Sequence, residues 1–171
     1  PPAPADALFD EIQALRSNPS DELRQGMELA HQGKLAEGIA LIENLLQSHP
    51  RLVEAHVGLI SLYTRLGQFA RGEDHYLAAK RLDPNHPGNY FNQGLLLARL
   101  GSFPRAEREF RRALEINPAY PEAHTKLAYT LEAQNRWSEA AAVFRQAIEN
   151  NPEDSQAHFG LGRVLVKQEA Y

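Results

Sequence analysis

The feature that most constrains this chain is a 34-residue spacing between amino acids that end or turn helices. Proline, which stops a helix, stands at four positions in that register: Pro50, Pro84, Pro118 and Pro152. Residues that tolerate the left-handed backbone of a tight turn stand at four more: Gly33, Gly67, Gly101 and Asn135. Two residues after each turn comes a large apolar side chain: Leu35, Phe69, Phe103 and Trp137. Several independent landmarks with one period predict a tandem repeat.

One unit, residues 87–120, shows what each repeat is expected to form. Its apolar pattern predicts two amphipathic helices joined by a tight turn. Ala106, Phe110 and Ala113 fall on one buried stripe of the second helix, and Gly94 is expected where the first helix approaches its neighbour closely. None of these residues carries chemistry, so the pattern indicates packing.

The same offsets divide the chain into an N-terminal segment and an all-α solenoid. We predict a linker and a capping helix within residues 1–18 and helix pairs over residues 19–171. The repeats are expected at 19–52, 53–86, 87–120 and 121–154, with a partial fifth at 155–171. Pro87 and Pro121 are expected at the first position of their helices, and Asp154 as the N-cap of the last helix.

The N-terminal segment has an amphipathic pattern of its own. After the proline-rich residues 1–5, a helix is predicted as far as Arg16, with one apolar face: Leu8, Phe9, Ile12 and Leu15. One interpretation is a cap over the first repeat, which solenoids require. The other is a detachable segment that docks on the same molecule or on a neighbouring one.

Charge and composition limit the classes of partner. The chain has 171 residues, with 18 Lys and Arg against 22 Asp and Glu, for a net charge of −4. This balance argues against a broad phosphate-binding surface. The absence of cysteine excludes disulfides and thiolate metal sites. No apolar run approaches the roughly 20 residues of a membrane span and no signal peptide is visible, so a soluble protein is expected. The first residue is Pro1 rather than Met, which leaves a targeting segment, and so the compartment, open.

The offsets of the landmarks resemble those of the tetratricopeptide repeat family. In the fourth repeat the matching residues are His124, Leu127, Ala128, Leu131, Ala140, Phe144, Ala147 and Pro152. The resemblance implies a right-handed α-solenoid whose first helices line a concave groove. It also implies a non-catalytic protein–protein interaction scaffold that binds a protein or peptide partner there, with no cofactor. Helical repeats that read RNA are a related alternative, but their slightly longer period and the negative charge of this chain disfavour them.

By the same resemblance, particular positions of the first helices face the groove. The predicted partner-binding residues are Leu23, Met27, Val57, Ser61, Arg65, Phe91, Asn92, Leu95, Arg99, Lys126, Tyr129 and Phe159. They form an apolar and aromatic floor with a basic line along one side. Such a floor suits an extended peptide or an amphipathic helix with hydrophobic anchors. The alternative is that neighbouring first helices simply pack there.

Two specialised grooves of the family can be tested at these positions. A clamp for a C-terminal carboxylate needs converging cations. Asn92 and Lys126 stand in suitable places for it, but Val57 and Ser61 occupy the positions of its Lys and Asn. A ladder of asparagines at successive repeats is reduced here to Asn92. We therefore expect neither groove.

One histidine position recurs in three repeats: His56, His124 and His158. Equivalent residues of adjacent repeats lie about 8–10 Å apart, too far for one zinc ion with donors near 2 Å. The third repeat has Tyr90 at this position, which favours a partly buried ring over a metal ligand. His75 and His86 are expected at the surface.

Charged residues interleave along the second helix of the third repeat. The basic ones are Arg105, Arg108, Arg111 and Arg112, and the acidic ones are Glu107, Glu109 and Glu115. Their helical spacing predicts a solvated face with Arg105–Glu109 and Arg111–Glu115 ion pairs. A nucleic-acid surface is disfavoured.

The sequence contains no motif of a known catalytic class. A Gly-rich phosphate loop, a nucleophile elbow and an HExxH pattern are all missing, so we predict that the chain is not an enzyme. The alternative to groove binding is an architectural, self-associating module of a larger protein, which could be an enzyme with its catalytic domain elsewhere. Its contact surface is expected on the partial fifth repeat, at Leu161, Val164 and Leu165.

Overall fold

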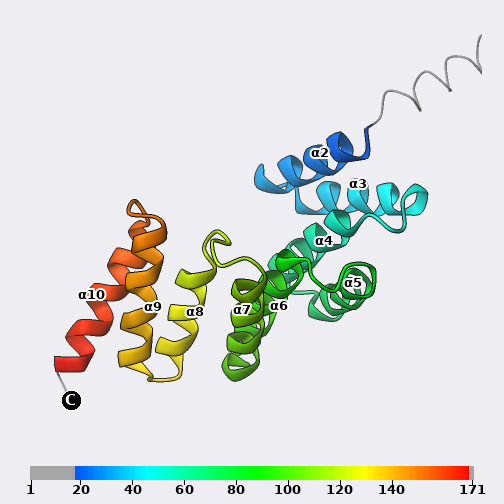
Figure 1. Cartoon of the computed structure of the whole chain (residues 1–171). Helices are drawn as coiled ribbons and strands as arrows, with labels where there is room; N and C mark the ends of the chain where they lie inside the picture. The colour runs from blue at the N-terminus through cyan, green and yellow to red at the C-terminus, as the bar shows by residue number, and fades with distance from the viewer. Residues whose placement is uncertain (1–17, 170–171) are drawn as a thin grey trace, which may run out of the picture.

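A computed structural model describes residues 18–169, which form antiparallel pairs of α-helices stacked into a solenoid (Figure 1). No β-strand occurs in this range. The helices are α2 (Pro19–His31), α3 (Leu35–Ser48), α4 (Val53–Leu66), α5 (Phe69–Leu82), α6 (Pro87–Arg99), α7 (Phe103–Ile116), α8 (Ala123–Ala133), α9 (Trp137–Asn150) and α10 (Ser155–Glu169). The helix predicted between residues 5 and 16 lies outside the described residues. No described helix has the length and apolar character that crossing a membrane requires.

The predicted turn residues have the backbone that the repeat requires. Gly33, Gly67 and Gly101 have φ of +87°, +79° and +72°, and Asn135 has φ of +60°. Glycine adopts this left-handed region without steric cost, and asparagine is among the residues that tolerate it best. The prediction of a tight turn between the two helices of each pair is confirmed.

A contact between a glycine and a large apolar residue recurs in the first and third helix pairs. Ile42, Phe110 and Phe144 are fully buried on the second helices. A Cβ atom on Gly94 would lie 2.7 Å from the Phe110 ring, and one on Gly26 would lie 2.6 Å from Ile42. These distances are shorter than van der Waals contact, so the prediction that Gly94 permits close approach is confirmed.

The recurring histidine position has a structural role. His56 Nε2 and His158 Nε2 lie 3.2 and 2.9 Å from the carbonyl oxygens of Pro50 and Pro152. Tyr90, in the same register, donates its hydroxyl to the Pro84 carbonyl oxygen at 2.7 Å. The ring thus satisfies a carbonyl that the proline turn leaves without a backbone partner. Burial differs among these rings: Tyr90 is buried, His56 is half-buried and His158 is exposed. His124, the remaining member, is half-buried and contacts the Asn150 side chain instead.

The fourth repeat departs from the pattern at its start. The prediction that Pro121 opens its first helix is wrong, because α8 begins at Ala123. Glu122 has φ of +60°, and turns closed by Tyr120 N–H to Asn117 O and by Ala123 N–H to Tyr120 O occupy the preceding residues. As a consequence α8 is short, and α6 and α8 touch over less of their length than α4 and α6 do.

Asp154 caps the last helix as predicted. Its carboxylate accepts hydrogen bonds from the Ala157 N–H at 3.0 Å and from the Thr125 hydroxyl at 2.6 Å. Burial disfavours the charged carboxylate, but these hydrogen bonds outweigh it and lower the pKa of Asp154. The cap therefore ties α10 to α8 as well as starting α10.

Candidate partner-binding groove

The predicted groove residues come from the first helices of successive pairs, α2, α4, α6, α8 and α10. Most of them are half-buried: Leu23, Met27, Val57, Ser61, Asn92, Leu95, Lys126 and Tyr129. Three are exposed, namely Arg65, Arg99 and Phe159, and one is buried, Phe91. The predicted groove residues therefore differ in how accessible they are to a partner.

Two of the polar residues connect neighbouring first helices. Asn92 donates its side-chain N–H to the Val57 carbonyl oxygen at 2.9 Å. Arg65 donates to the Ala30 carbonyl oxygen, also at 2.9 Å. Each bond spans 35 residues and links one repeat to the next. The amide of Asn92 is consequently occupied in packing.

Phe91 belongs to the core rather than to the groove surface. It is 9% exposed, and its ring centroid lies 5.8 Å from that of Phe110 and 5.0 Å from that of Tyr120. Aromatic pairs at these separations stabilise a core beyond their buried area. A partner could reach this ring only by opening the solenoid.

Three other predicted residues, Leu95, Lys126 and Tyr129, lie around one depression beside α8. A depression of about 130 Å³ opens between α6, α7 and α8, and its lining is almost entirely apolar. It is lined by Leu95, Ala98, Phe103, Phe110, Lys126, Tyr129 and Thr130. We call it the α6–α8 depression. It lies where the late start of α8 leaves the first helices less closely packed than α4 and α6.

One cationic side chain, Lys126, lines this depression. The Lys126 ammonium lies 3.1 Å from the Gln156 amide oxygen and 3.8 Å from the Glu122 carboxylate. Arg99, one repeat earlier, is exposed and forms no ion pair with any residue from 18 to 169. Burial raises the pKa of Tyr129, so its hydroxyl stays protonated and donates to the Gln156 carbonyl oxygen at 2.8 Å. The edge of the depression therefore favours an anionic neighbour.

Two family models described as tetratricopeptide repeat match the chain, one over residues 23–87 and the other over residues 97–160. Together they cover well over half of it. The chain belongs to the tetratricopeptide repeat family. No curated protein matches its sequence. Proteins of this family are generally non-catalytic scaffolds, and the helical solenoid is consistent with a scaffold for protein–protein interaction.

Several solved tetratricopeptide repeat structures are similar to this fold. PilF of Pseudomonas aeruginosa superposes with a TM-score of 0.81 at 16% identity, over 90% of this chain and 70% of that one. MamA of Desulfovibrio magneticus RS-1 superposes with a TM-score of 0.72 at 16% identity, over 90% and 87%. The first repeat domain of Spaghetti (RPAP3), bound to an HSP90 peptide, superposes with a TM-score of 0.65 at 20% identity, over 68% and 93%. At these identities the likeness shows the shared fold.

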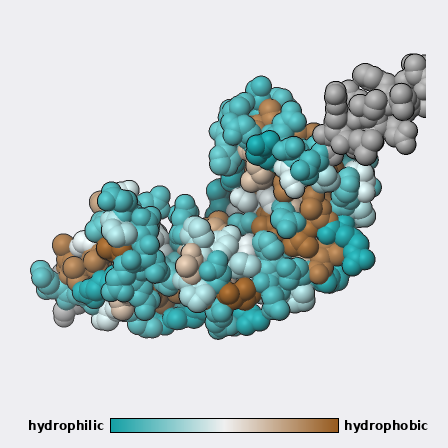
Figure 2. Space-filling view, turned by 45° about the horizontal axis from the view of Figure 1, so that its top comes forward, coloured by the Kyte–Doolittle hydropathy of each residue, from teal (hydrophilic) through white to brown (hydrophobic). Residues whose placement is uncertain are grey.

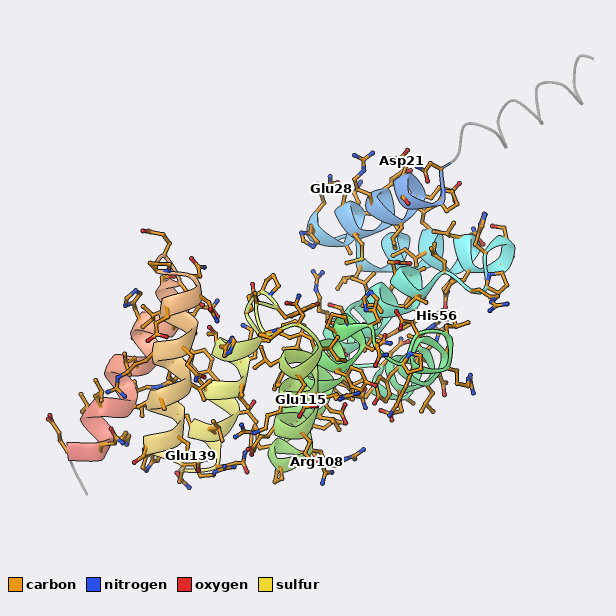
Figure 3. All side chains as sticks on the ribbon, in the orientation of Figure 1. Asp21, Glu28, His56, Arg108, Glu115 and Glu139 are labelled. Atoms are coloured by element: carbon orange, nitrogen blue, oxygen red, sulfur yellow. The ribbon has the colours of Figure 1, made fainter. Side chains whose placement is uncertain are left out.

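The charged face of α7 forms ion pairs, but with partners other than those predicted. Arg111 pairs with Glu107 at 3.0 Å and Arg112 pairs with Glu115 at 2.9 Å. Side-chain direction selects the i−4 and i+3 neighbours here rather than the i+4 ones. Arg108, inside α7, is exposed and extends outward from the helix (Figure 3). The tetratricopeptide repeat solenoid thus has a solvated, mixed-charge face on this side.

The expectation that His75 lies at the surface is wrong. Its ring is half-buried, with its Nδ1 atom 2.9 Å from Nδ1 of His56 on α4 and its ring stacked on Tyr63. The two histidines are 19 residues apart in the sequence, a separation that the 34-residue period does not predict. Within residues 18–169 no cluster of three or more His, Asp or Glu side chains is arranged to hold a metal ion.

The residues predicted to make the last helix adhesive are also not the exposed ones. Val164 is fully buried, and Leu161 and Leu165 are half-buried against the core. Phe159 and Val166 are instead exposed, each at 68%. The helix is turned so that its leucines complete the packing on α9, because Gly160 lets α10 approach the Phe144 ring. Phe159 thus lies on a separate surface from the α6–α8 depression.

Proposed function

We propose that this protein is a non-catalytic scaffold that binds an extended segment of a partner protein along its first helices. The observation that carries the proposal is the α6–α8 depression, an apolar pocket with Lys126 on its border and exposed Arg99 one repeat earlier. An apolar pocket beside cations fits a segment that places an aliphatic side chain next to an acidic one.

The volume limits the anchoring side chain. An apolar cavity of about 150 Å³ in a protein core admits benzene, so a depression of about 130 Å³ takes one branched aliphatic side chain. Burial of such a side chain contributes about 1.5–3 kcal/mol. One anchor of this size supports weak binding unless neighbouring contacts add to it, and the cationic border supplies those contacts.

The RPAP3 repeat domain, which shares the fold, holds a peptide in its solved structure. In this chain Val57 and Ser61 stand where a carboxylate clamp needs Lys and Asn. We therefore propose recognition of an internal segment rather than of a free C-terminus.

Selection of a random peptide library displayed on phage, with the whole chain as bait, tests the proposal. The selected peptides should share an aliphatic residue beside an acidic one. Ala98→Leu, which fills the depression, and Lys126→Glu, which reverses the charge on its border, should each weaken binding at least tenfold. Arg108→Glu on the opposite charged face is the matched control and should change nothing.

Two results would contradict the proposal. The first is a set of peptides that binds the Ala98→Leu and Lys126→Glu variants as tightly as the unchanged protein. The second is a loss of binding in Arg108→Glu, which would move the site to the charged face of α7.

A further inference from the structure

The last helix presents an apolar face that no described residue covers. Phe159 and Val166 are the most exposed large apolar side chains among residues 18–169, and Gly162 lies between them on the same face of α10. Figure 2 shows apolar surface gathered at this end of the solenoid. A hollow of about 420 Å³ lies against it. We call this surface the α10 face.

The α10 face is a packing hole whose usual occupant is missing from the described residues. Gly162 has the same position in its repeat as Gly26 and Gly94. Those two glycines are covered by Ile42 and Phe110, large residues 16 positions later on the second helix. At Gly162 no atom lies within 4 Å of where a Cβ would be. The hole therefore has the shape that receives a large apolar residue of a helix.

The border of the hole is basic. His158, Arg163 and Lys167 line the hollow together with the apolar residues. Arg163 is paired with Glu132, whereas Lys167 forms no ion pair with a described residue. The complementary occupant is a helix that carries a large apolar residue with acidic neighbours.

The chain itself contains such a segment. Residues 5–16, which the sequence predicts to be helical, have Ala5, Phe9 and Ile12 at the spacing that Gly38, Ile42 and Leu45 have in α3. In α3 this spacing seats Ile42 over Gly26. The segment is also acidic, with Asp6, Asp10 and Glu11 around Phe9. It therefore matches the α10 face in both pattern and charge.

The segment cannot reach the α10 face of its own molecule. It is joined to α2, and α2 and α10 lie at opposite ends of the solenoid (Figure 1). A 12-residue helix is about 18 Å long, whereas four repeats at about 10 Å each separate the two ends. If residues 5–16 fill the hole, they must therefore belong to another molecule.

We propose that residues 5–16 of one copy of this chain dock on the α10 face of a second copy, with Phe9 seated over Gly162. Such a contact is heterologous, because each copy uses a different surface at each end. Association therefore leaves one free segment and one free face, and chains of copies grow with protein concentration.

Two full-length variants that each lack one half of the contact test this proposal. Phe9→Asp removes the apolar residue of the segment. Gly162→Glu fills the hole and places a negative charge against the acidic segment, at a position where a side chain meets no described atom. In sedimentation velocity the unchanged chain should form oligomers that grow with concentration. Each variant alone should self-associate at least tenfold more weakly than the unchanged chain. An equimolar mixture of the two should form a one-to-one dimer, because the intact segment of one variant docks on the intact α10 face of the other.

The controls separate docking from general adhesion. Gly162→Ala should leave association intact, because the fourth repeat has an alanine, Ala128, at the equivalent position and buries it fully. Lys167→Glu should weaken association in low salt. A monomeric unchanged chain, a Phe9→Asp variant that associates as before, or a mixture that stays monomeric would each overturn the proposal. The second of these results would point to symmetric pairing of two α10 faces.

Discussion

The histidine pair between α4 and α5 makes the stability of this solenoid depend on pH. His56 Nε2 lies 3.2 Å from the Pro50 carbonyl oxygen, and because a carbonyl can only accept, this nitrogen carries the proton. Nδ1 of a neutral His56 then accepts, and His75 Nδ1 donates to it across 2.9 Å. Protonation of both rings would place two cations at that distance.

The magnitude follows from the shifted pKa of His75. Burial, followed by the repulsion from His56, lowers this pKa from 6.5 to about 4. Glu43 and Asp74 oppose the shift and Arg71 adds to it. In the unfolded chain His75 takes up a proton near pH 6.5, so below that pH the unfolded state binds more protons and stability falls. At about 1.4 kcal/mol for each tenfold change in proton affinity the limit is about 3 kcal/mol. Solvent screening of a half-buried ring reduces it to about 1–2 kcal/mol.

Urea unfolding of the unchanged chain and of His75→Phe between pH 7.5 and 4.5 measures this term. Phenylalanine keeps a flat ring against Tyr63 but cannot titrate. The stability of the unchanged chain relative to the variant should fall by about 1–2 kcal/mol as the pH is lowered through 6.5 toward 4. His49→Gln, at an exposed position, serves as control and should leave the pH dependence unchanged. Parallel stability curves for the unchanged chain and His75→Phe would refute the reasoning.

Four further predictions concern packing, a helix cap and a turn, and all are measured by urea unfolding. Gly94→Ala should destabilise by about 1–3 kcal/mol, because its Cβ would lie 2.7 Å from the Phe110 ring. The matched change Gly162→Ala should instead stabilise by up to about 1 kcal/mol, since open space surrounds that position. Asp154→Ala should cost about 1–2 kcal/mol through loss of the α10 cap. Asn135→Ala should cost about 1 kcal/mol at φ of +60°, whereas Asn135→Gly should be neutral or better.

The periodic part of the fold could be predicted because it depends on contacts inside one repeat. The turn at Gly67, the ring at Tyr90 and the stripe through Phe110 each follow from spacing within about 20 residues. The 34-residue period multiplies that signal, so each landmark was found several times.

The groove could be predicted less well because its chemistry depends on contacts between repeats. Asn92 is bonded to Val57 and Phe91 is packed on Tyr120, and neither contact has a periodic signal. Ala98 was missed although it occupies a groove-facing register, because its small side chain draws no attention in the sequence. The prediction of which side of α10 is exposed was wrong, because apolar periodicity alone does not determine how the helix is rotated about its axis.

The α6–α8 depression exists because one backbone rule is broken. A proline at the start of a repeat opens α6 at Pro87, but the equivalent Pro121 lies in a turn and is followed by Glu122 at φ of +60°. A non-glycine residue in this region costs about 1–2 kcal/mol, which the surrounding contacts must offset. Where α4 and α6 pack closely, Asn92 is engaged by Val57, whereas beside the shortened α8 the side chains of Leu95 and Tyr129 line open space. The site proposed for a partner thus lies where α6 and α8 pack less closely than α4 and α6 do.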